Sequence, residues 1–188
     1  MNEYLLQLKQ EFRKCGSWAI WNENGDIAPL IGLKPNIVFI GFNASKELAD
    51  KEDWANFHFG NRHYMKLAKI ISEKEFLLFK GAYTTDIIKT DIDPDSRKVD
   101  KILKEDQKNG GDKIKENKDK IEREIELLSK ISKNKNLLFI CMGNLAFKWT
   151  KSMIKGDVYK IYHYSNWGKE KVKERIRRDL REIIKNVR

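Results

Sequence analysis

Four short apolar segments interrupt an otherwise polar chain and predict strands. They cover residues 36–41, 81–88, 136–143 and 157–165. The first and third are continuous and rich in Ile, Val, Leu and Phe, which is typical of strands that are covered on both faces of a parallel sheet. The fourth alternates between apolar and polar residues, as an edge strand does. The pattern therefore predicts a four-stranded sheet.

The segments around these strands repeat apolar residues at helical spacing. Their apolar faces are formed by Leu5, Leu8 and Phe12, by Tyr64, Leu67, Ala68 and Ile71, by Ile121, Ile125, Leu128 and Ile131, and by Val172, Ile176, Leu180 and Ile184. Alternating strands and helices imply a sheet with helices on both faces. We expect one domain over residues 1–188, a three-layer α/β/α sandwich with a short, mostly parallel four-stranded sheet.

Residues 91–117 do not follow this alternation. The segment is polar and rich in Lys, and it contains Gly110 and Gly111. These features favour an exposed insertion before the third strand.

The charge balance indicates an anionic partner. The chain has 38 Lys and Arg against 28 Asp and Glu, which gives a formal net charge of +10. An excess of this size attracts polyanions, so nucleic acid is the first partner class to consider and an anionic membrane the second. No apolar run reaches the length of a membrane span, and the N-terminal segment is too charged for a secretory signal, so we expect a cytoplasmic protein, nucleoid-associated in a prokaryote.

The cysteines and histidines give no metal signature. The chain has 2 Cys and 3 His, and none of them are closely paired. We expect no zinc or iron-sulfur site and no bound metal. Cys141 lies in an apolar run, where a buried reduced thiol is the usual state.

The polar residues that follow the predicted strands are the candidates for chemistry, because parallel sheets bind ligands beyond the carboxyl ends of their strands. Residues 41–45 follow the first strand, 84–86 end the second, and 163–168 follow the fourth. They offer an amide at Asn43, a carboxylate at Asp86 and an imidazole at His163 to one crevice.

Three segments together resemble the uracil-DNA glycosylase superfamily. They are GFNAS at 41–45, FHFGNRHYMKL at 57–67 and the late His163-x-Ser165. The first two are most similar to the mismatch-specific (thymine/uracil) branch, and the third is more similar to the uracil-excising enzymes. The chain departs from the family at Ala44 and Tyr164, where prolines are usual and stiffen loops near DNA.

The resemblance implies a role for each matching residue. Asn43 would orient the attacking water, and His163 would donate a hydrogen bond to the departing base. Phe59, Phe57 and Phe42 would contact the flipped base, with stacking by Phe59 first and Phe57 second. The residues implied in DNA binding are Ser45, Arg62, Ser165, Asn166, Trp167 and Lys169. Among them, Trp167 would occupy the space that the flipped base leaves in the base stack.

Asp86 occupies the position that reads the base edge in several branches of the family. An amide pairs with both N3–H and O4 of uracil, whereas an ionised carboxylate only accepts hydrogen bonds. Asp86 therefore weakens the case for uracil and admits bases that present donors, such as hypoxanthine or xanthine.

The resulting hypothesis is a monomeric, monofunctional DNA glycosylase that uses no cofactor and acts on a damaged or deaminated base. The alternative is a catalytically inactive nucleic-acid-binding protein of the same fold, which suits the missing prolines. Each residue also has a structural interpretation: Asn43 as a turn residue, Asp86 as a cap, and Phe57 and Phe59 as core. A nucleotide-handling protein of another kind is disfavoured because no phosphate-binding glycine motif is present.

Overall fold

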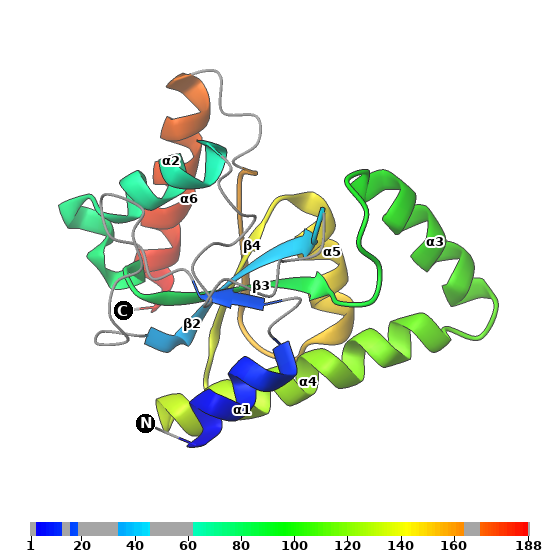
Figure 1. Cartoon of the computed structure of the whole chain (residues 1–188). Coiled ribbons are helices and arrows are strands. Elements are labelled where there is room, and N and C mark those ends of the chain that lie inside the picture. Colours follow the sequence, from blue (N-terminus) through cyan, green and yellow to red (C-terminus); the bar gives the residue numbers. More distant parts are fainter. Residues whose placement is uncertain (1–2, 13–15, 19–33, 46–61, 164–169, 188) are drawn as a thin grey trace.

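The computed structural model describes residues 3–12, 16–18, 34–45, 62–163 and 170–187 (Figure 1). None of the helices within these ranges combines the length and the apolar character that crossing a membrane requires. The same ranges hold no group of three or more His, Cys, Asp or Glu side chains that could bind a metal ion.

All four predicted strands are present at the centre of the molecule. They are β2 (Lys34–Asn43), β3 (Ala82–Ile88), β4 (Leu138–Met142) and β5 (Val158–Ile161). These strands pair in parallel, in the order β3-β2-β4-β5. A short strand that the pattern did not predict, β1 (Gly16–Trp18), pairs antiparallel with β3 at the edge.

Helices cover both faces of the sheet, which confirms the predicted three-layer α/β fold. One face carries α1 (Glu3–Phe12), α3 (Ser96–Lys108), α4 (Asp112–Ser132) and α5 (Asn144–Met153). The other carries α2 (Arg62–Ile71), the 3-10 helix η1 (Lys74–Phe79) and α6 (Glu170–Val187). In Figure 1, α1 and α4 lie below the sheet, and α2 and α6 lie above it.

The alternation of side chains along each strand divides the core in two. Val38 and Ile40 of β2 face α4 and α5, whereas Ile37 and Phe39 face α2 and α6. Residues of β4 alternate in the same way. Both faces are therefore buried, which is why the strands are continuous apolar runs.

Residues 91–117, expected to be an exposed insertion, are largely exposed but form helices that pack against the core. This segment forms α3 and the first part of α4, and Val99 and Leu103 of α3 are 0% exposed. The carboxylate of Asp106 accepts hydrogen bonds from the backbone N–H groups of Lys113 and Ile114, at 3.3 and 3.0 Å, which caps α4. The many charged residues lie on the outer faces of these helices, and they make the narrow apolar stripe on the inner face difficult to recognise in the sequence.

Asp100 joins α3 to α5. Its Oδ1 accepts a hydrogen bond from Trp149 Nε1 at 2.9 Å, and Lys104 Nζ lies 2.6 Å from Oδ2. Partial burial acts to raise the pKa of Asp100, but hydrogen bonds from Lys104 and Trp149 outweigh it and lower that pKa. The ionised carboxylate thus fixes α3 against the body of the protein.

Candidate active site at the carboxyl edge of the sheet

Two of the polar residues singled out in the sequence, Asn43 and His163, lie at the carboxyl ends of parallel strands. Asn43 is the last residue of β2, and His163 follows β5, which ends at Ile161. Because β2 and β5 run in the same direction on either side of β4, both residues belong to the same edge of the sheet.

The amide of Asn43 is held by three hydrogen bonds. Its side chain is buried, with 5% of the residue exposed. Nδ2 donates to the carbonyl oxygens of Ala44 at 3.0 Å and Asp93 at 2.8 Å. Oδ1 accepts from Ser96 Oγ at 3.0 Å. Two of these partners are distant in the chain: Asp93, 50 positions on, lies between β3 and α3, and Ser96, 53 positions on, is the first residue of α3.

The connection at residues 91–96 is itself held in place. The backbone N–H of Asp93 donates to the carbonyl of Ala44 at 3.1 Å. The carboxylate of Asp93 accepts from the N–H of Asp95 at 2.8 Å and from Lys98 Nζ at 2.7 Å. The hydrogen bond from Lys98 lowers the pKa of Asp93. The carboxylate of Asp95 caps α3 by accepting from the N–H of Arg97 at 3.0 Å.

His163 packs against a glycine that sequence reasoning missed. Gly143 ends the loop between β4 and α5, with φ of +98° and its N–H donating to the carbonyl of Ile161 at 3.0 Å. A Cβ at Gly143 would lie 3.0 Å from His163 Cδ2 and 3.1 Å from its Cβ. Only glycine combines this backbone conformation with so close an approach of the imidazole ring. The apolar run before Gly143 gave no signal of this contact.

The sequence led us to expect Asp86 at the end of its strand, but the structure places it inside β3. The strand continues to Ile88, and Asp86 is 3% exposed. It pairs with Gly41 of β2, two residues before Asn43. The neighbouring Thr85 faces the opposite side from Asp86, toward α4. Asn43 and Asp86 lie on adjacent strands near the carboxyl edge of the sheet, but the amide of Asn43 is bonded to α3, on the face that carries α4 and α5.

The remaining predicted residues are separated from this group or lie outside the described ranges. Phe42 is 7% exposed and packs in the core beneath α4 and α5, on the opposite face from Asp86. Ser45 is exposed just beyond β2, and Arg62 begins α2. The residues outside the described part of the chain are Phe57, Phe59, Ser165, Asn166, Trp167 and Lys169.

A buried polar cluster on the α4 side of the sheet was also missed. Lys89 Nζ lies 2.8 Å from Glu124 Oε2, and both side chains are 0% exposed. Glu124 Oε1 accepts hydrogen bonds from Tyr83 OH at 2.6 Å and Thr85 Oγ1 at 2.9 Å. Lys89 also donates to Thr85 Oγ1. The charges satisfy each other inside the protein, which gives the cluster a structural role between β3 and α4.

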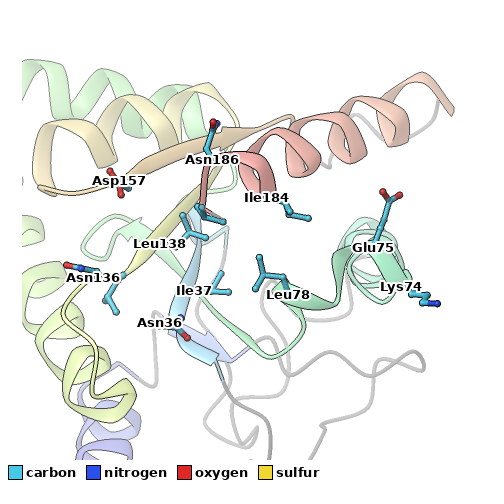
Figure 2. A pocket seen from close by; sticks show the side chains of 12 residues that line it. Asn36, Ile37, Lys74, Glu75, Leu78, Asn136, Leu138, Asp157, Ile184 and Asn186 are labelled. Atoms are coloured by element: carbon cyan, nitrogen blue, oxygen red, sulfur yellow. The ribbon is translucent and has the colours of Figure 1, made fainter.

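A separate cavity of about 670 Å³ lies at the opposite edge of the sheet (Figure 2). It is lined by residues at the amino ends of β2 and β4, among them Ile37 and Leu138, and by Ile184 near the end of α6. Asn36, Asn136 and Asp157 also line it. Because ligands of open parallel sheets bind at the carboxyl edge, this cavity is not the candidate active site.

Comparisons with protein-family models, curated proteins and solved structures find no significant match to the chain.

Proposed function

We propose that the protein is a monofunctional DNA glycosylase that hydrolyses the N-glycosidic bond of a damaged or deaminated base flipped out of DNA. The site is the carboxyl edge of the sheet, with Asn43 and His163 as the catalytic residues. The proposal joins the resemblance of three sequence segments to the observed α/β/α fold and to the net charge of +10.

The reaction sets two requirements that these side chains can meet. The sugar becomes oxocarbenium-like as the bond breaks, and the base departs with negative charge. Water must be aimed at the sugar, and the departing base needs a hydrogen-bond donor. Asn43 accepts a hydrogen bond from the water, and His163 donates to the base. An amide is a poor general base, so we expect slow turnover.

The hydrogen bonding of Asn43 is the single observation that carries the proposal. Both of its N–H groups are bound to backbone carbonyls, at Ala44 and Asp93. The amide therefore has only its oxygen to offer to a further partner, and Ser96 occupies one of the two lone pairs of that oxygen. The remaining lone pair can accept a hydrogen bond from a water molecule, whereas the two occupied N–H groups leave Asn43 no donor to offer.

The position of Asp86 supports a substrate that presents N–H donors. Its carboxylate is buried one strand away from Asn43, near the same carboxyl edge of the sheet. An ionised carboxylate accepts hydrogen bonds and repels a carbonyl oxygen such as O4 of uracil. Hypoxanthine and related bases are therefore the first substrates to test, with uracil next.

The second candidate is a catalytically inactive nucleic-acid-binding protein of the same fold. It is favoured by Ala44 and Tyr164, which stand where the family that the chain resembles has prolines that stiffen loops near DNA. The two candidates share DNA as the partner and differ only in chemistry.

The test is an excision assay on duplex and single-stranded oligonucleotides that carry uracil, hypoxanthine, xanthine, thymine opposite guanine, or no lesion. Alkali cleaves the strand wherever a base has been removed. Asn43→Ala and His163→Ala are compared with the wild type, and binding to undamaged DNA is measured for each. Cleavage at one lesion that is lost in both variants, while DNA binding persists, supports the glycosylase.

No cleavage of any substrate together with salt-sensitive DNA binding would instead favour the binding protein. The variant Asp86→Asn tests the substrate assignment separately. The amide can donate to O4 of uracil, so this variant should cleave uracil faster than the wild type does. An unchanged uracil rate would remove Asp86 from base recognition.

A further inference from the structure

The orientation of the Asn43 amide is fixed by its surroundings. The carbonyl oxygens of Ala44 and Asp93 can only accept hydrogen bonds, so the atom that faces them must be Nδ2. Turning the amide over would place Oδ1 against two carbonyl oxygens. Oδ1 consequently points toward Ser96, whose hydroxyl donates to it at 3.0 Å.

Ser96 is well placed to hold this oxygen in one direction. It is the first residue of α3, and the carboxylate of Asp95 caps the same helix end. Asp100, further along α3, is bonded to Trp149 of α5, which fixes the helix against the body of the protein. The hydroxyl therefore reaches Asn43 from a rigid element, a property that precise orientation of a reacting group requires.

We propose that Ser96 is a positioning residue for the hydrolysis, which holds the carbonyl oxygen of Asn43 where it accepts a hydrogen bond from the attacking water. Residues 91–96 and the start of α3 are then part of the active site. This inference rests on the proposed glycosylase function. Ser96 itself does not touch the substrate, and it acts through Asn43.

The experiment compares Ser96→Ala with Ser96→Thr, which keeps a hydroxyl at the same position. Ser152→Ala is the control, because Ser152 in α5 also donates a hydrogen bond, to the carbonyl of Trp149 at 2.8 Å, but lies outside the site. Single-turnover excision rates, the Kd for lesion-bearing DNA and the Tm are measured for each variant. The lesion is the one that the wild type cleaves fastest.

We expect Ser96→Ala to slow single-turnover excision by about tenfold, because the carbonyl oxygen of Asn43 is then no longer held in the direction of the attacking water. The Kd should stay at the wild-type value, the Tm should fall by no more than about 2–4 °C, the effect of one lost hydrogen bond, and Ser96→Thr should restore most of the rate. Ser152→Ala should cleave DNA at the wild-type rate.

Two outcomes would overturn the inference alone. One is a wild-type rate for Ser96→Ala while Asn43→Ala is inactive, and the other is an equal loss of rate in Ser96→Ala and Ser96→Thr accompanied by a lower Tm. Wild-type protein that cleaves none of the substrates would refute the proposed function itself, and this inference with it.

Discussion

Replacing Lys89 by Met should destabilise the protein far more than the same replacement at the surface. Lys89 and Glu124 form an ion pair with 2.8 Å between Nζ and Oε2, and both side chains are 0% exposed. Met preserves much of the volume of the side chain but leaves the carboxylate of Glu124 without its counter-charge. Breaking a buried pair in this way typically costs about 3–5 kcal/mol.

A second ion pair serves as a control, because it has the same distance between nitrogen and oxygen but is exposed to solvent. Lys120 Nζ and Glu116 Oε1 are also 2.8 Å apart, but 44% and 55% of their side chains are exposed. Water screens such a pair, so Lys120→Met should change the free energy of unfolding very little. Comparing the two replacements separates the effect of burial from that of losing a lysine.

Urea unfolding followed by circular dichroism measures the free energy of unfolding of each variant. A double-mutant cycle with Lys89→Met and Glu124→Gln then isolates the coupling between the two charges, and the double variant should lose less stability than the two single losses combined. If Lys89→Met costs no more than Lys120→Met, the structural role assigned to the buried cluster is refuted.

Three further predictions concern single residues. Burial raises the pKa of the Cys141 thiol to about 12. In a Cys15→Ser background the native protein should therefore not react with a thiol reagent at pH 8, whereas the urea-unfolded protein should react at once; fast labelling of the native form would contradict this. Because the pKa of Asp100 is lowered on folding, its ionised form stabilises the protein above the unfolded-state pKa of about 3.9, and this contribution disappears as the pH falls through the folded-state value. Asp100→Asn should therefore be less stable than the wild type at pH 7, and the difference should shrink as the pH falls below the unfolded-state pKa; a difference that stays constant would argue against the assignment. Gly143→Ala should displace His163, because the added Cβ would lie 3.0 Å from the ring, and should lower the excision rate as His163→Ala does; retained activity would show that His163 tolerates movement.

The sheet could be predicted because β2 and β4 are buried on both faces and are therefore apolar throughout. The short strand β1 and the helix α3 escaped prediction for opposite reasons. β1 has only three residues, too few for any pattern. In α3 the apolar stripe is narrow, and the surrounding charged residues, Lys above all, dominate the composition.

The candidate site was predicted only in part. Asn43 and His163 could be singled out because polar residues stood at the ends of apolar runs. Asp86 was taken to end its strand, since a buried carboxylate within a strand has no signature in the sequence. The contact between Asn43 and Ser96 joins residues 53 positions apart, and the packing of His163 on Gly143 depends on a loop conformation. Only tertiary structure brings such pairs together.

Release of a free base from DNA tests the central claim most directly. Wild-type protein would be incubated with a hypoxanthine-containing duplex and, separately, with a uracil-containing one, and the products separated by chromatography with mass detection. The proposed function predicts a free base and an intact strand with one abasic site, with neither product formed by Asn43→Ala. Unchanged DNA with both lesions, in the presence of wild-type protein that binds it, would contradict the claim.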